Sequence, residues 1–167
     1  QRPIIIIGPA FSFVHWLDEL TEKFHLAEGS RVMETGGYKG RSREMSKPEL
    51  HTMISKKLGV PPDWIVCEYG MCELESQAYD TVAGNGLKRC FRFPSWARAQ
   101  IINADTGVEV NDGETGLLRI FDLSNVRSVI GVQTQDLAIR RGNGFELIGR
   151  STRANPRGCS LALSEVS

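Results

Sequence analysis

The sequence lacks the features that mark several large classes of protein. Its longest aliphatic run, residues 4–7, is far too short to span a bilayer, and no basic segment precedes an apolar one as in a signal peptide. Twenty basic and twenty acidic side chains cancel, so no net charge favours binding to nucleic acid or to an anionic membrane. We therefore expect no membrane span and no nucleic-acid partner.

Metal-binding patterns are also scarce. The chain has four cysteines, which are Cys67, Cys72, Cys90 and Cys159. They include no CxxC pair, which gives little support to a cysteine metal site and favours a reduced, cytoplasmic setting. The three histidines have no second ligand at metal spacing, and we interpret them as structural or surface residues: His15, His25 and His51.

The two common phosphate-binding patterns, GxxxxGK[ST] and GxGxxG, are absent as well. The 167 residues suffice for one domain or two small lobes. The sequence opens with Gln1-Arg2-Pro3 directly before an apolar run and has no initial Met. We interpret it as a piece of a longer protein.

Residues 1 to about 90 alternate between strand and helix patterns. Short apolar runs predict strands at residues 4–7, expected to be fully buried, and at residues 31–34 and 64–66. One helix is predicted from a Ser12 cap to about Phe24, and a second starts at a capping box of Ser46 and Glu49 and stops at Gly59. This order predicts an α/β fold with a small parallel strand-helix-strand sheet.

The pattern changes to short β-type runs after about residue 90. They cover residues 98–103, 116–123, 128–134 and 145–148, and turn residues such as Gly142-Asn143-Gly144 separate them. This half predicts an antiparallel β-sheet or distorted barrel lobe. Pro94 interrupts any regular element, so we expect subdomains of residues 1–92 and 93–167.

Two segments that follow predicted strands are candidate ligand sites. In residues 35–40, the adjacent Gly36 and Gly37 would allow the backbone to approach a flat or phosphorylated ligand, although Gly-Gly turns are common. In residues 68–77, Glu73 and Glu75 follow a strand and could hold a divalent metal. They could equally begin a helix, where acidic residues favour the dipole.

Two further candidates lie in the second half. Asp136 follows a β run and could accept hydrogen bonds from the vicinal hydroxyls of a ribose, or it could start a turn. Arg150, Arg153 and Arg157 lie close in sequence to Cys159, and their charges would favour its reactive thiolate if they are also close in space. The alternative is a structural cysteine near a terminus.

The serial order of these motifs resembles that of the adenylate-forming superfamily, and in detail the acyl-protein synthetases of the LuxE type. The resemblance spans about residues 4–161. It rests on Thr35-Gly36-Gly37-Tyr38-Lys39-Gly40, Glu68-Tyr69-Gly70-Met71-Cys72-Glu73-Leu74-Glu75-Ser76-Gln77, Pro94-Ser95-Trp96, Gln133-Thr134-Gln135-Asp136-Leu137, Gly149-Arg150 and Arg157-Gly158-Cys159-Ser160-Leu161.

The resemblance implies an enzyme that uses ATP and Mg²⁺ to convert a fatty acid or other carboxylic acid to an acyl-adenylate. The acyl group then passes to a cysteine and on to a partner fatty-acid reductase or other acyl acceptor. By motif, Gly36 and Gly37 line the adenine pocket, Tyr69 stacks on the base and Asp136 binds the ribose.

The remaining roles follow in the same way. Glu73 acts as a catalytic residue that holds Mg²⁺ near the α-phosphate, and Arg150 approaches the ribose or phosphate. Cys159 matches the cysteine that accepts the acyl group. The signature residues Gly70, Met71 and Cys72 would also line the nucleotide site.

Two departures from the family pattern limit the implied activity. Cys72 replaces the usual Thr, and a thiol is a weaker hydrogen-bond donor than a hydroxyl. The Ser/Thr/Gly-rich phosphate loop of the family is absent, so we expect this chain to match the C-terminal half, to need the missing N-terminal half, and to be inactive alone. The alternatives are an acyl- or aryl-CoA ligase fragment and a non-catalytic nucleotide-binding or interaction module.

Overall fold

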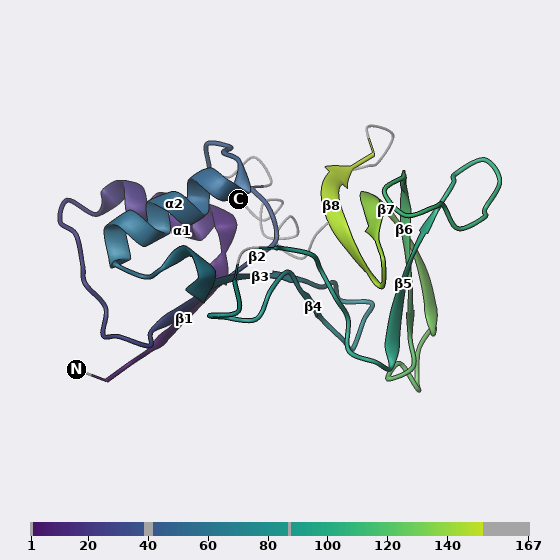
Figure 1. The fold of residues 1–167 in the computed structure, drawn as a ribbon, viewed down its shortest axis with the longest axis horizontal. Helices are drawn as coiled ribbons and strands as arrows, with labels where there is room; N and C mark the ends of the chain where they lie inside the picture. Colours follow the sequence, from purple (N-terminus) through teal and green to yellow (C-terminus); the bar gives the residue numbers. More distant parts are fainter. Residues whose placement is uncertain (1, 39–41, 87, 152–167) are drawn as a thin grey trace, which may run out of the picture.

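Two four-stranded sheets form the framework of the chain (Figure 1). The computed structural model describes residues 2–38, 42–86 and 88–151. In the first sheet, sheet A, the strand order is β1 (Ile5–Pro9), β2 (Arg31–Thr35), β3 (Ile65–Tyr69) and β4 (Ala78–Tyr79). The first three strands are parallel and β4 is antiparallel. The predicted parallel sheet is confirmed.

Helices α1 (Ala10–Glu19) and α2 (Lys47–Leu58) pack on one face of sheet A (Figure 1). The capping box is confirmed, because Ser46 Oγ accepts from the backbone N–H of Glu49 and Glu49 accepts from the N–H of Ser46. Gly59 ends α2 in the left-handed conformation that glycine adopts most readily. A 3₁₀ turn (Pro62–Trp64) then leads into β3.

Two local predictions in this region were wrong. Ser12 does not cap α1, because β1 continues to Pro9 and the helix begins at the next residue. Phe24 lies beyond the helix, which ends at Glu19 when the backbone of Leu20 becomes extended. Apolar spacing continued past the helix end, and it did not distinguish helix from the connecting segment.

Strand β1 is not fully buried, contrary to expectation. Ile5 and Ile7 are 61% and 62% exposed, whereas Ile6 packs toward the helices. Side chains of a strand alternate between the two faces of its sheet. Since β1 is an edge strand and α1 and α2 cover only one face, alternate isoleucines remain exposed on the other.

The second sheet, sheet B, is antiparallel and follows chain order. Its strands are β5 (Ala97–Ile102), β6 (Thr115–Asp122), β7 (Gly131–Arg141) and β8 (Gly144–Arg150). The expected fold class is thus confirmed, and its second part is a sheet rather than a distorted barrel. Strand β7 is longer than predicted, so Asp136 lies within a strand and does not start a turn.

Sheets A and B share one core. Tyr69 at the end of β3 packs edge-to-face on Phe145 of β8, with ring centroids 5.5 Å apart, and lies beside Phe91 and Phe93. Phe91 and Phe145 also pair through their backbones. This packing brings the carboxyl end of sheet A against sheet B. None of the described helices is long and apolar enough to cross a membrane.

Candidate functional site

The carboxyl ends of β2 and β3 bring two of the predicted segments together. Thr35 and Glu68 are partners in the parallel ladder, so the next residues, Gly36 and Tyr69, lie side by side at the ends of β2 and β3. Gly36 has a φ of 70°, and a Cβ built on Gly36 or Gly37 would meet no atom within 4 Å. The Gly-Gly turn therefore presents open backbone at the sheet edge where α/β proteins bind ligands.

Glu68 and Gly70 form a close contact within the signature segment. The Thr35 hydroxyl donates to the buried carboxylate of Glu68. A Cβ added to Gly70 would lie 2.3 Å from Glu68 Oε1, so only glycine leaves this carboxylate in place. Neither Thr35 nor Glu68 was predicted as a site residue, because their pairing depends on strand register.

Residues 70–77 form an irregular loop, so of the two alternatives left open for this segment the helix start is not observed. Met71 packs against the shared core, whereas Cys72 and Glu73 are exposed. After this loop the chain returns in β4, which begins at Ala78 and pairs antiparallel with β3. The Glu73 carboxylate therefore projects from a loop beside the sheet edge.

Three predicted site residues from distant parts of the chain meet directly. The Tyr69 hydroxyl donates to Asp136 Oδ2 at 2.7 Å, and Arg150 Nε donates to Asp136 Oδ1 at 3.3 Å. Asp136 on β7 and Arg150 on β8 are ladder partners. The carboxylate is thus oriented from both sides.

The Tyr69 phenol stays protonated in this arrangement. Its ring is 8% exposed, and burial, reinforced by the neighbouring Asp136 carboxylate, raises the pKa of Tyr69 well above its usual range. A protonated phenol can donate its hydrogen to the Asp136 carboxyl group. The stacking of adenine on the Tyr69 ring stays a prediction.

A cluster of ionisable groups surrounds the buried Glu34 on the helix side of the same edge. Glu34 Oε1 is 3.2 Å from His51 Nε2 and 3.8 Å from Lys47 Nζ. Burial opposes the charge on Glu34, but the His51 hydrogen bond and the Lys47 charge hold the pKa of Glu34 below its ordinary range. Lys47 Nζ also donates to Cys67 Sγ and lies 4.9 Å from the centre of the Phe91 ring.

Cys67 is buried within this cluster and is not a reactive thiol. Burial, with the Glu34 carboxylate beside it, raises the pKa of Cys67 far above that of a free cysteine, despite the opposing Lys47 charge. Sequence reasoning had no signal for this cluster, because its members come from β2, α2 and β3.

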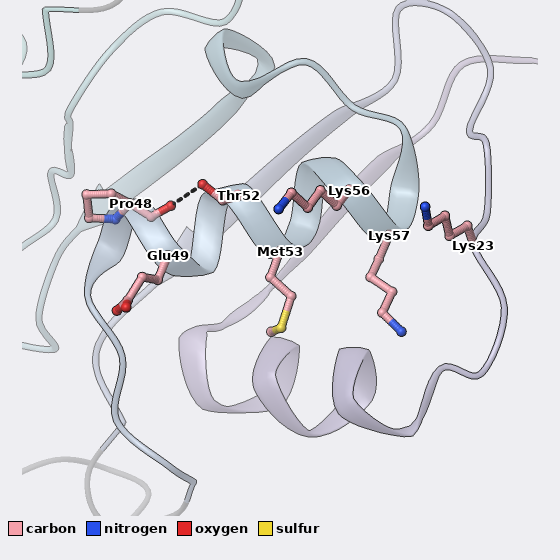
Figure 2. A pocket seen from close by; sticks show the side chains of 7 residues that line it. All are labelled: Lys23, Pro48, Glu49, Thr52, Met53, Lys56 and Lys57. Atoms are coloured by element: carbon pink, nitrogen blue, oxygen red, sulfur yellow. Dashed lines mark hydrogen bonds between the residues drawn. The ribbon is translucent and has the colours of Figure 1, made fainter.

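A surface hollow of about 530 Å³ runs along the outer side of α2, away from this sheet edge (Figure 2). Its lining residues are Lys23, Pro48, Glu49, Thr52, Met53, Lys56 and Lys57. None of these is a predicted site residue. We place the candidate site at the sheet edge because that is where the oriented polar groups converge.

The fit of Mg²⁺ can be judged from the oxygen ligands present. No group of three or more His, Cys, Asp or Glu side chains within the described ranges is arranged to hold a metal. Mg²⁺ at nucleotides is commonly bound through one or two carboxylates together with phosphate oxygens and waters. A single exposed carboxylate, Glu73, fits that mode of binding. Cys159 lies outside the described residues.

Comparisons with known proteins agree on one family. The family "Acyl-protein synthetase, LuxE" matches residues 1–167. A long-chain-fatty-acid–luciferin-component ligase of Vibrio harveyi is 22% identical over 99% of this chain and 46% of its own length. The chain spans about half the length of the curated relatives it matches.

Solved structures show the same fold. ATP-bound MatB from Rhodopseudomonas palustris aligns with a TM-score of 0.62 and 16% identity, over 89% of this chain and 31% of MatB. A structure from work on fatty acyl-adenylate ligases of E. coli and L. pneumophila aligns with a TM-score of 0.63 and 13% identity, over 88% and 34%. The fold is therefore that of the adenylate-forming enzymes.

Proposed function

This chain belongs to the LuxE family of acyl-protein synthetases, and from that membership we propose that it is the nucleotide-binding and acyl-accepting part of an ATP-dependent acyl-protein synthetase. The substrate is a fatty acid, as the names of the curated relatives suggest. The observation that carries the proposal is the Asp136 carboxylate, which Tyr69 and Arg150 orient beside the Gly36 turn.

In this proposal the sheet edge holds the nucleotide. Asp136 accepts hydrogen bonds from the two ribose hydroxyls, while Tyr69 and Arg150 keep its oxygens in place. Gly36 and Gly37 allow the adenine to lie against the backbone. Arg150 Nε lies 3.3 Å from Asp136 Oδ1, so the Arg150 guanidinium is placed to meet ribose or phosphate oxygens as well.

The first chemical step joins the two substrates. A carboxylate oxygen of the fatty acid attacks the α-phosphorus of ATP, and pyrophosphate leaves with the electron pair of the broken bond. The Glu73 carboxylate lies near the α-phosphate, where it would bind the metal. A bound Mg²⁺ would supply neutralisation of the phosphate charge in this step.

The second step makes the acyl-protein. The Cys159 thiolate attacks the acyl carbon, a thioester forms, and AMP leaves. A partner reductase or another acceptor then takes the acyl group.

The relatives are about twice as long as this chain, so the test uses the full-length protein. It is incubated with labelled fatty acid and ATP, and the adenylate and the protein-bound label are measured separately.

Cys159→Ser is expected to remove the hydroxylamine-sensitive label from the protein while leaving adenylate formation in place. The reason is that the serine hydroxyl stays protonated and is a far weaker nucleophile than a thiolate. Cys72→Thr, which introduces the usual family residue, is the matched control and keeps the label. A thioester label that persists in Cys159→Ser would refute Cys159 as the acyl acceptor, whereas adenylate formation with no protein-bound label in the wild type would favour an acyl-CoA ligase.

Glu73→Gln is expected to raise the Mg²⁺ concentration for half-maximal adenylate formation roughly 10- to 100-fold. An amide loses the charge that attracts the cation, and interactions with charged groups contribute about 1.5–3 kcal/mol. The measurement is a Mg²⁺ titration at saturating ATP. Glu75→Gln removes the neighbouring exposed charge and is the control; a larger shift there would transfer the metal role to Glu75.

A further inference from the structure

We propose that Asp122 and Asn125 are positioning residues that hold the backbone at Glu73 and immediately after it and thereby restrain the position of its carboxylate. The inference rests on the proposed function, in which Glu73 meets the nucleotide-bound metal. Both residues come from the end of β6 and the turn after it, and no motif of the sequence marked either one.

Asp122 anchors the loop on the C-terminal side of Glu73. Its side chain is fully buried. Asp122 Oδ2 accepts from the backbone N–H groups of Glu75 at 3.1 Å and Ser76 at 2.8 Å, and Oδ1 accepts from the Ser76 hydroxyl at 2.9 Å. A buried carboxylate that accepts several hydrogen bonds loses most of its freedom to move.

Hydrogen bonds keep Asp122 ionised in spite of its burial. Burial opposes the charge, but bonds from Ser124 and Ser76 hold the pKa of Asp122 below its usual range. Trp96 Nε1 donates to the Ser76 hydroxyl oxygen at 3.0 Å. The anchor therefore joins the loop, the β6 end and the segment before β5 in one network.

Asn125 anchors Glu73 itself. Asn125 Nδ2 donates to the backbone carbonyl of Glu73 at 2.8 Å and to that of Val129 at 3.1 Å. Asn125 is 3% exposed, whereas the Glu73 side chain is exposed. The backbone of Glu73 is thus restrained from within the protein while its carboxylate faces solvent.

The anchors also set where Glu73 lies relative to Asp136. Strand β6 carries Asp122 and pairs with β7, which carries Asp136. One sheet therefore supports both Asp136 and the residue that anchors the Glu73 loop, which restrains the two carboxylates relative to each other. A single carboxylate on an irregular loop would otherwise move relative to the nucleotide phosphates.

The test uses the full-length protein and the variants Asn125→Ala and Asp122→Asn. Asn125→Ala is expected to raise the Mg²⁺ concentration for half-maximal adenylate formation about tenfold, as for the loss of one hydrogen bond, with the KM for ATP at saturating Mg²⁺ unchanged. In a Glu73→Gln background it is expected to add nothing, because it acts through Glu73. Additive shifts in the double variant would overturn the inference.

Asp112→Asn is the matched control. Asp112 is another carboxylate of the β-rich half that accepts a backbone N–H, that of Gly142 at the β7–β8 turn. This turn lies at the opposite end of the hairpin from Asp136 and Arg150. Asp112→Asn is expected to leave the Mg²⁺ requirement unchanged. A shift equal to that of Asn125→Ala would overturn the inference.

Hydrogen exchange separates the two ways in which the idea can fail. The amides of Glu75 and Ser76 are expected to exchange faster in Asp122→Asn; protection equal to wild type would overturn the positioning role even if Glu73 binds metal. An unchanged Mg²⁺ requirement in Glu73→Gln would instead overturn the metal role. If Asp122→Asn does not fold, Asn125→Ala with the double variant still decides the question.

Discussion

Asp136→Asn is expected to weaken ATP binding by the full-length protein about 100-fold and to lower adenylate formation with it. Hydrogen bonds to charged groups contribute about 1.5–3 kcal/mol, and each 1.4 kcal/mol is tenfold in Kd. The amide can accept through one oxygen only, and its NH₂ group would face the Tyr69 hydroxyl or the Arg150 guanidinium. Calorimetric titration of ATP measures the change.

A graded control separates the carboxylate from its supports. Tyr69→Phe removes only the hydroxyl that donates to Asp136 Oδ2, so we expect a loss of about tenfold, as for one hydrogen bond. Thermal unfolding of both variants checks that the fold is kept. A Tyr69→Phe loss equal to or larger than that of Asp136→Asn would contradict a ribose-binding role for Asp136.

Glu34→Ala is expected to lower the free energy of unfolding by about 1–3 kcal/mol, as for the loss of a buried group that leaves its hydrogen-bond partners unsatisfied. The side chain of Glu34 is 1% exposed, and its removal leaves Lys47 and His51 without their buried partner. Urea unfolding measures the difference. Glu28→Ala removes an exposed glutamate and is the control, with an expected change within about 0.5 kcal/mol.

Acid should reduce the contribution of Glu34 in a defined direction. Its pKa is lower in the folded protein than in the unfolded chain. The stabilisation is therefore fully present above the ordinary glutamate pKa of about 4.3 and is lost as the pH falls through the folded value. Wild type is expected to lose more stability than Glu34→Gln below about pH 4.3. Parallel curves for the two proteins would contradict a charged Glu34.

The sequence predicted local structure where a few neighbouring residues decide it. Ser46 and Glu49 bond to each other's backbone across three positions, and Gly59 ends the same helix, so both signals were readable. The turn at Gly142 and Asn143 was readable for the same reason. The burial of a strand depends on what packs on each face of its sheet. The prediction that residues 4–7 are fully buried was therefore wrong, because Ile5 and Ile7 are exposed.

The residues of the candidate site could be predicted from the sequence, but their contacts with one another could not. The family resemblance marked Tyr69, Asp136 and Arg150, yet the bond between Tyr69 and Asp136 joins positions 67 residues apart. Thr35 and Glu68 lie in the motifs that carry the resemblance, but no role was predicted for them because strand register brings them together. Asp122 and Asn125 escaped notice because nothing near them in the chain shows that they reach the Glu73 loop.

The sequence by itself determined the fold class, the order of its motifs and the family. These follow from periodicity, caps, turns and residue identity, which act over a few positions. Only the tertiary structure decided which motifs meet: the packing of Tyr69 on Phe145 brings sheet A against sheet B, and the buried Asp122 holds the loop that carries Glu73. Such contacts form when apolar surface is buried between segments that are distant in sequence. The residues next to each position therefore do not show which distant residues it will contact.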